Sequence, residues 1–296
     1  MLGWKTAKIA STRAGAELAA CARRGMAAGV IPQGLGRHTT HMGSASPSGV
    51  RGFHQTAMGR DTDKEKAEWD FDQIFRKNRV WVSTKREQDS DFFKRLANTQ
   101  HPKILWIGCS DARVPANTIC GLTSGDVFVQ RNIANMVVGT DANAMSVIQY
   151  AVDFLQVPHI VVCGHYDCGG VRAALRNMNH GSPLENWLRN IRDVWRLHRE
   201  ELKQIPSQEA RVRRLVELNV AEQCLNIYKS APVQKRRWDT KLKGGRVFPI
   251  IHGVVYDPAN GELNRVPIDI HQKVGELREC YDLYDFDSPD LHESFN

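Results

Sequence analysis

The sequence contains no apolar stretch long enough to cross a membrane, and none that could form the core of a secretory signal. A transmembrane helix needs about 20 consecutive apolar residues, so we expect no membrane span. The sequence also lacks a Cys-x-x-Cys pair, although it holds seven cysteines. An odd number of cysteines without a secretory signal argues against a disulfide scaffold, and the lack of a close pair argues against a redox function.

Acidic residues are almost missing from the first 60 residues, where Glu17 stands against eight Lys and Arg. This segment accounts for the whole formal charge of +7, and the rest of the chain is neutral. Its composition is typical of an organellar leader, so residues 1–60 are predicted to be a transit peptide that directs the protein to the mitochondrial matrix. A disordered leader on a cytoplasmic protein is the alternative. The neutral remainder argues against a nucleic-acid partner.

Residues 61–296 are predicted to form a single α/β domain, because short apolar runs alternate with helical patterns. This order favours a central, mostly parallel β-sheet with flanking helices. An amphipathic helix at residues 61–79 precedes the sheet and needs a surface for its apolar stripe, either its own domain or a partner. We expect strands at 103–107, 126–131 and 159–163, a hairpin of 245–256 with 262–268, and further helices at 90–97, 141–156, 183–205, 208–230 and 273–281.

Two strand-like runs end in loops rich in side chains that bind metals. The first, ILWIGCSDARVP at Ile104–Pro115, presents Cys109, Asp111 and Arg113. The second, IVVCGHYDCGGV at Ile160–Val171, presents His165 and Cys168. Ligands collect at the carboxyl ends of strands in an open α/β sheet, so we expect the two loops to meet. Two thiols, one imidazole and one carboxylate are a full tetrahedral set for zinc.

The chemistry of this set favours a metal that activates water. Two thiolates and a neutral imidazole cancel the charge of Zn²⁺, so a bound water should be less acidic than at a site of three histidines. Asp111 and Arg113 are two residues apart and could form an ion pair that keeps the carboxylate ionised. The same carboxylate could instead move onto the metal and close the site.

The two motifs, CSDARVP and GHYDCGG, resemble those of the β-class carbonic anhydrases in order and spacing. The similarity covers about residues 61–270, including QRNIAN at Gln130–Asn135 and the segment at Asn186–Trp195. It implies one zinc ion per subunit and the reversible hydration of CO₂ to bicarbonate and a proton. The implied zinc ligands are Cys109, His165 and Cys168, with Asp111 as a switchable fourth ligand and Arg113 as its partner.

The resemblance also implies a substrate pocket and a regulatory site. Gln100, Phe128, Ile133 and Tyr150 match the pocket that holds CO₂. In the family, several of these residues come from a neighbouring subunit, so a homodimer is implied, with the N-terminal helical arm packed on the partner; dimers could pair into tetramers. Trp106, Arg131 and Tyr256 match a set that binds bicarbonate away from the metal in one subgroup and favours the closed site.

Other interpretations explain fewer of these residues. A structural zinc site would need the four ligands but neither Arg113 nor an apolar pocket. Relatives that hydrolyse carbon disulfide or carbonyl sulfide use the same ligands, so the zinc motif alone leaves that activity open. The remaining cysteines of the domain are predicted to be buried, small apolar residues: Cys120, Cys163, Cys224 and Cys280.

Overall fold

Five strands form one sheet in the computed structural model, which describes residues 70–284 except residue 245. The predicted leader, residues 1–60, lies outside these residues, as does the start of the first predicted helix. The strand order is β2-β1-β3-β4-β5, with the first four strands parallel and β5 antiparallel to β4. The predicted mostly parallel sheet is therefore confirmed. The strands are β1 (Ile104–Cys109), β2 (Val127–Asn132), β3 (His159–His165), β4 (Ile250–Asp257) and β5 (Glu262–Arg265).

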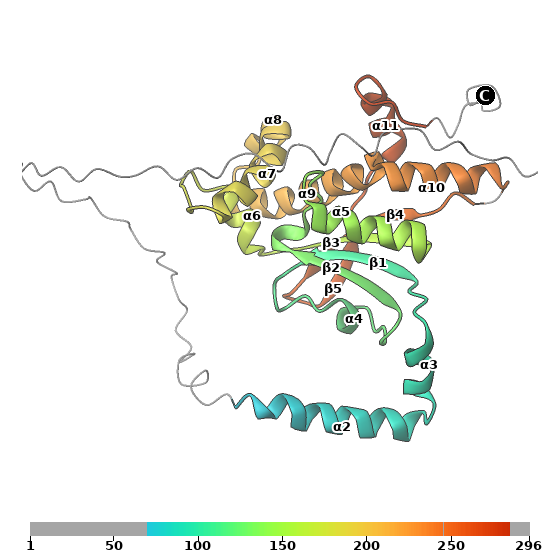
Figure 1. Cartoon of the computed structure of the whole chain (residues 1–296). Helices are drawn as coiled ribbons and strands as arrows, with labels where there is room; N and C mark the ends of the chain where they lie inside the picture. The colour runs from blue at the N-terminus through green and yellow to red at the C-terminus, as the bar shows by residue number, and fades with distance from the viewer. Residues whose placement is uncertain (1–69, 245, 285–296) are drawn as a thin grey trace, which may run out of the picture. The chain divides into compact units, whose positions relative to one another are not determined.

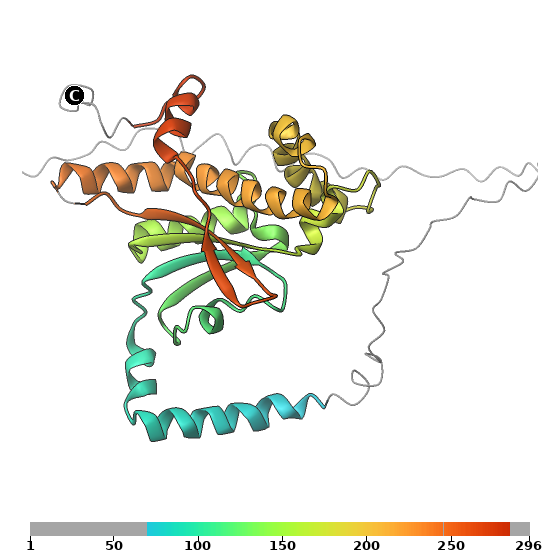
Figure 2. The same cartoon turned by 180° about the vertical axis from the view of Figure 1, so that it is seen from behind.

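Helices flank the sheet unequally. Among the described helices, α5, α9 and α10 lie on one face, whereas the short α4 lies on the other (Figures 1 and 2). The helical elements are α2 (Asp72–Gln88), α3 (Phe92–Asn98), α4 (Ala116–Ile119), η1 (Ile133–Asn135), α5 (Ala142–Gln149), η2 (Tyr150–Phe154), α6 (Gly169–Ala174), α7 (Leu184–Leu197), α8 (Arg199–Lys203), α9 (Gln208–Lys229), α10 (Ala231–Leu242) and α11 (Ile270–Arg278). None of the helices in this part of the chain has the length and apolar character that a bilayer crossing requires.

Helix α9 fixes the position of the sheet beneath it. Gly164 and Gly253, on β3 and β4, face Val220 of α9 so closely that a Cβ would lie 2.6 Å and 3.0 Å from its methyl groups. These two glycines allow the helix to pack directly on the strands. The helix begins at Ser207, whose side chain accepts a hydrogen bond from the N–H of Ala210. Its inner face is fully buried and carries both apolar residues and amides.

Helix α5 begins where the sequence predicts but ends sooner. The carboxylate of Asp141 accepts hydrogen bonds from the N–H groups of Asn143 and Ala144, as an N-cap does. The predicted helix to residue 156 divides into α5 and one π-helical turn, η2, which shifts the register of the last side chains. The predicted pocket residue Tyr150 is the first residue of this turn.

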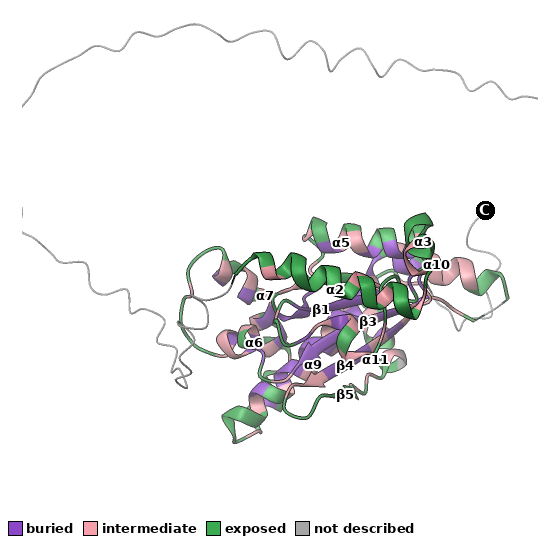
Figure 3. Ribbon diagram, turned by 90° about the horizontal axis from the view of Figure 1, so that it is seen from below, coloured by how far each residue is buried: buried purple, intermediate pink, exposed green. Residues whose placement is uncertain are grey.

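The first described helix has no buried residue. We predicted a helix over residues 61–79, but α2 continues to Gln88, because no Gly or Pro interrupts the chain until Asp89 adopts an extended conformation. Phe71 and Phe75 are 61% and 52% exposed, and Figure 3 shows the helix exposed along its length. Its aromatic contact with α3 runs through Trp81, which meets Phe93 edge-on at 5.5 Å between ring centroids.

Candidate metal centre

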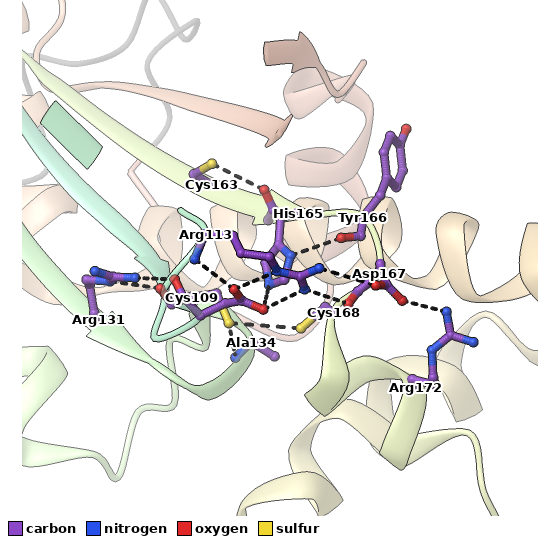
Figure 4. A network of polar contacts seen from close by, with 12 residues as sticks. Cys109, Arg113, Arg131, Ala134, Cys163, His165, Tyr166, Asp167, Cys168 and Arg172 are labelled. Atoms are coloured by element: carbon purple, nitrogen blue, oxygen red, sulfur yellow. Dashed lines mark hydrogen bonds and ion pairs between the residues drawn. The ribbon is translucent and has the colours of Figure 1, made fainter. Parts of the chain in front are cut away.

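The two predicted motif loops meet at the carboxyl ends of the adjacent parallel strands β1 and β3. Cys109 is the last residue of β1, His165 is the last residue of β3, and Cys168 precedes the first turn of α6. Their ligand atoms lie within 4.8 Å of one another and all three residues are buried (Figure 4). The Sγ atoms of the two cysteines are 4.0 Å apart. The structure thus brings together three ligands that are 59 residues apart at the extremes.

The imidazole of His165 is oriented as a metal ligand. Its Nδ1 donates to the carbonyl oxygen of Tyr166 at 2.9 Å, since a carbonyl can only accept. That hydrogen bond leaves the lone pair of Nε2 free, and Nε2 is buried without a hydrogen-bond partner. A buried, unpaired imidazole nitrogen is costly unless a ligand satisfies it. The donor set therefore fits a metal such as zinc, with both thiols and Nε2 converging on one point.

The thiol of Cys109 is surrounded by donors. Its contact with the thiol of Cys168 lowers its pKa, and the N–H of Ala134, 3.4 Å from Sγ, acts in the same direction. The pKa of Cys168 is raised by the same contact and by burial, so the two thiols titrate as a coupled pair. Gly170 lets the second loop approach η1, because a Cβ there would lie 2.7 Å from Ile133 and 3.4 Å from Cβ of Ala134.

Asp111 and Arg113 form the predicted ion pair. The guanidinium donates from Nε to Oδ1 at 2.9 Å and from Nη2 to Oδ2 at 2.7 Å, a bidentate arrangement. This contact with Arg113 lowers the pKa of Asp111 to about 2. One oxygen of the carboxylate, Oδ2, lies 3.8 Å from Nε2 of His165. Asp111 is therefore ionised, paired and adjacent to the ligand cluster at once.

A second carboxylate that the sequence analysis missed also contacts Arg113. Asp167 lies between the ligands His165 and Cys168 in a left-handed conformation, with φ of 58°. Its Oδ2 accepts from Nη1 of Arg113 at 3.3 Å, and its Oδ1 accepts from Arg172 at 2.7 Å. Arg113 is thus fixed between two carboxylates (Figure 4). The sequence does contain a signal for this residue, namely an acidic residue between two metal ligands. Asp also adopts a left-handed backbone conformation more readily than most residues.

The predicted substrate residues are brought together only in part. Phe128 and Tyr150 stack, with ring centroids 5.7 Å apart, and Tyr150 stacks in turn on Phe154, which is 70% exposed and was not predicted. Ile133, in η1, lies beside Gly170 of the second metal motif and is 40% exposed. Gln100 is exposed between α3 and β1 and makes no hydrogen bond within the described residues. Within the described residues, the side chains of Ile133, Tyr150 and Phe154 thus form apolar surface that is exposed to solvent.

The three predicted bicarbonate residues share one face of the sheet. Arg131 is paired with Gly108 on the next strand, two residues beyond Trp106, and Tyr256 packs against the small buried cluster that includes Trp106. The Nε1 atom of Trp106 is buried without a hydrogen-bond partner. Arg131 donates to the carbonyl oxygens of Cys109 at 2.8 Å and Asp111 at 2.5 Å. In this structure its guanidinium therefore holds the backbone of the first metal loop.

The other cysteines mostly follow the prediction. Cys163 and Cys224 are buried, and burial raises the pKa of both thiols. Cys120 is half-buried. Cys280 is exposed after α11, so its predicted burial was wrong: the helix buries Val274, but its end and the residues directly after it are exposed.

Known proteins with similar sequences are carbonic anhydrases. The profile of the family described as "Carbonic anhydrase" matches residues 104–263. A carbonic anhydrase of Emericella nidulans is 50% identical over 212 residues, which cover 72% of this chain and 90% of that protein. A carbonic anhydrase of Candida albicans is 34% identical over 221 residues, which cover 73% of this chain and 74% of the relative.

Solved structures agree with the sequence comparison. A tetrameric β-carbonic anhydrase of Sordaria macrospora is 40% identical, with a TM-score of 0.62 over 66% of this chain and 96% of that one. The β-carbonic anhydrase CafA of Aspergillus fumigatus is 36% identical, with a TM-score of 0.63 over 72% of this chain and 99% of that one. A Coccomyxa β-carbonic anhydrase in complex with acetazolamide is 34% identical, with a TM-score of 0.63, and covers 70% and 91% of the two chains.

Proposed function

The chain belongs to the β-class carbonic anhydrase family, and from this premise we propose that it hydrates CO₂ reversibly to bicarbonate and a proton at a zinc ion held by Cys109, His165 and Cys168. The observation that carries the proposal is the buried cluster of three ligand atoms within 4.8 Å, in which Nε2 of His165 has no other partner. Zinc bound there would supply Lewis-acid chemistry that activates water at its fourth position.

Asp111 is proposed to orient the reacting water. Its carboxylate stays ionised at neutral pH because Arg113 lowers its pKa to about 2, so it can accept a hydrogen bond but not deliver a proton. Oδ2 lies beside the ligand nitrogen of His165, which places this acceptor next to the metal position. Arg113 and Asp167 restrain the carboxylate, and its release from Arg113 would let Asp111 act as the fourth ligand of a closed site.

CO₂ is proposed to bind against apolar side chains beside the metal. An uncharged gas gains little from ion pairs, so Phe128, Tyr150 and Ile133 suit it better than the charged loops do. We propose that Gln100 and part of this surface act across a homodimer, which explains why the surface is incomplete in one chain. The apolar side chains of α2 are also not buried in one chain, and packing of this arm on the partner would cover them. The tetrameric relative of Sordaria macrospora supports a further pairing of dimers.

Bicarbonate is proposed to inhibit the enzyme from a second site formed by Trp106, Arg131 and Tyr256. The unpaired indole N–H of Trp106 supports an anion ligand there. An anion that draws Arg131 toward itself would weaken its hydrogen bonds to the carbonyls of Cys109 and Asp111. The first metal loop would then lose its restraint, and Asp111 could leave Arg113 for the metal.

The composition of residues 1–60 supports a mitochondrial location, which we propose on that ground alone. Fusing these residues to a fluorescent reporter tests it directly. Import into mitochondria supports the proposal, and a diffuse cytoplasmic signal contradicts it.

Stopped-flow measurement of CO₂ hydration by the zinc-loaded protein tests the activity. We expect turnover that depends on zinc and disappears when the metal is removed and returns when it is restored. Full zinc binding without hydration would contradict the proposal and favour a structural site. Faster conversion of carbon disulfide or carbonyl sulfide than of CO₂ would assign the same centre to a related hydrolase.

A further inference from the structure

The metal centre rests on an unusual backbone turn that is distant in sequence from both motifs. Ala134 and Asn135, in η1, have φ angles of 62° and 50°, and both are buried. Two successive left-handed residues with a Cβ are unfavourable and persist only when their surroundings hold them. The turn directs the N–H of Ala134 to Sγ of Cys109, at 3.4 Å.

Buried amides of α9 hold one side of this turn. Asn219 donates from Nδ2 to the carbonyl oxygen of Ala134 at 3.0 Å. Gln223 donates from Nε2 to Oδ1 of Asn219 at 3.0 Å and accepts at Oε1 from the N–H of Val137 at 2.8 Å. Asn219 and Gln223 are each 1% exposed. They are four residues apart on one face of the helix, so α9 presents them as a continuous ladder to the loop.

Trp187 of α7 holds the other side. Its indole Nε1 donates to the carbonyl oxygen of Ile133 at 2.8 Å. The carbonyls of Ile133 and Ala134 are thereby fixed by two different helices, and the peptide N–H between them points at the thiol. A core without special demands would place apolar residues at these positions of α9, because buried amides are tolerated only when fully paired.

An N–H donor to a metal-bound thiolate withdraws electron density from the sulfur. Groups that hydrogen-bond to metal ligands orient those ligands and tune the metal, and their loss typically lowers metal affinity by about 10- to 100-fold. The Ala134 N–H is such a group for Cys109, but it is a backbone group and cannot itself be removed by substitution. Its position depends on the side chains that hold the turn.

We infer that Asn219 and Gln223, together with Trp187, are positioning residues of the metal centre, which fix the left-handed turn so that the Ala134 N–H donates to the Cys109 thiolate. The inference rests on the proposed metal site, but it concerns residues of α9 and α7 that lie outside both metal motifs, and Trp187 reaches the proposed substrate surface at the backbone carbonyl of Ile133. The alternative is that these amides only stabilise the fold and have no effect on the Cys109 thiolate.

The test compares Asn219→Ala with Gln234→Ala. Gln234 is also a buried amide, in α10, and donates to the carbonyl of Tyr228 at 2.7 Å, far from the metal loops in sequence and in element. Both variants lose one buried amide, so the control measures the general cost of that loss. Zinc affinity is measured by competition with a chelator, and the sulfur-to-metal charge-transfer band is recorded on the Co²⁺-substituted proteins.

For Asn219→Ala we expect zinc to bind about 10- to 100-fold more weakly and the charge-transfer band to move to lower energy, because a thiolate without its donor is more electron-rich. For Gln234→Ala we expect affinity within about twofold of the parent and an unmoved band. An unchanged affinity and band in Asn219→Ala, or equal changes in both variants, overturns the inference.

A second variant, and readouts that do not depend on turnover, keep the test decisive. If Asn219→Ala does not fold, Trp187→Phe keeps an aromatic ring but removes the donor to Ile133, and the same shift in smaller measure is expected; no shift counts against the inference. Metal affinity and the Co²⁺ band do not require turnover. A parent that binds metal through thiolates but does not hydrate CO₂ therefore contradicts the proposed function alone.

Discussion

Two of the Asp–Arg pairs among the described residues differ in geometry and in surroundings. Asp111 and Arg113 lie beside the buried metal ligands, where a second carboxylate, Asp167, also contacts the guanidinium. Asp70 and Arg76 pair at 2.5 Å at the start of the exposed α2 arm. The arginine lowers the pKa of its aspartate in both pairs, but the side chain of Asp111 is 21% exposed and that of Asp70 is 51% exposed.

The difference shows what gives an ion pair a function. An exposed pair is screened by water and contributes little to stability or to chemistry. At the metal centre, the backbone N–H of Arg113 and the carbonyl contacts of Arg131 restrain the same loop, so the carboxylate is held toward Arg113 in this structure. The metal end of the sheet is thus held by contacts within the chain, whereas the arm presents apolar side chains that no other described part of the chain buries.

Removal of a thiol is the largest perturbation of this end of the sheet. We expect Cys109→Ala to lose zinc and activity together, because a single thiolate and one imidazole leave too few ligands. Cys280→Ala is the matched control, since that thiol is exposed and remote from the ligands in sequence, and should keep one zinc per subunit. Metal analysis of the purified proteins decides, and full zinc occupancy in Cys109→Ala would show that the ligand assignment is wrong.

The sequence predicts this centre in residue detail for a physical reason. A zinc site requires particular side chains at the ends of neighbouring strands, so the requirement is visible as two motifs. The supporting residues were not predicted: Asn219 and Trp187 are an ordinary amide and an ordinary aromatic in amphipathic helices. Their role comes from contacts with carbonyls of the turn at Ala134, which no local pattern encodes.

The two ion pairs can be compared directly by substitution. We expect Arg113→Ala to lower kcat/KM by about 100-fold with zinc retained, because Asp111 loses the partner that orients it, and groups that manage a proton typically contribute about 10²–10⁴-fold. Arg76→Ala should leave kcat/KM unchanged, since its partner Asp70 is exposed. Equal effects of the two substitutions would remove the distinction between the pairs.

The Asp111–Arg113 pair should also make the free energy of unfolding depend on pH, in a direction set by the pKa of Asp111. The pKa of Asp111 is about 2 in the folded protein and about 4 in the unfolded chain. The pair therefore contributes stability above about pH 4 that is lost as the pH falls toward 2. The difference in free energy of unfolding between the parent and Arg113→Ala should therefore be constant from about pH 5 to neutral and shrink below pH 4. Urea unfolding across this range measures it, and a difference that grows on acidification would contradict the assignment.

The arm was predicted less well than the metal centre. Its helix ends nine residues beyond the predicted limit, at Gln88, because its apolar side chains are not buried by any other described segment and so give no sharp boundary. Similarly, Tyr150 and Phe154 stay exposed within the described residues, and we propose that a second copy completes this surface. Sequence patterns locate what a chain packs on itself, and locate less well what a second copy would cover.

Substitution on the two faces of α2 tests whether a second copy covers the arm. Phe75 and Val80 are 52% and 67% exposed, and five residues along a helix place them about 140° apart. We expect Phe75→Asp to weaken the dimer about 30-fold, as loss of an interface hot spot does, and Val80→Asp to weaken it far less. Sedimentation over a range of concentrations compares them, and a parent that is an active monomer would contradict the proposed role of the arm.

Arg131 should have the smallest and most selective effect, because it touches only the backbone of the metal loop. Bicarbonate bound by Trp106, Arg131 and Tyr256 would favour the closed site, in which Asp111 occupies the position of the reacting water. Rising pH favours the open site by mass action, so activity of the parent should rise steeply with pH and bicarbonate should inhibit beyond simple competition. Asp111 itself does not titrate in this range, since its pKa is about 2.

Arg131→Ala removes the cation and should weaken the excess inhibition by bicarbonate about fivefold with zinc retained. Arg265→Ala, an exposed change on β5, should not weaken it. A pH–rate series with and without bicarbonate separates these outcomes. A shallow profile in the parent, insensitive to bicarbonate, would mean that Arg131 only braces the loop through its hydrogen bonds to Cys109 and Asp111.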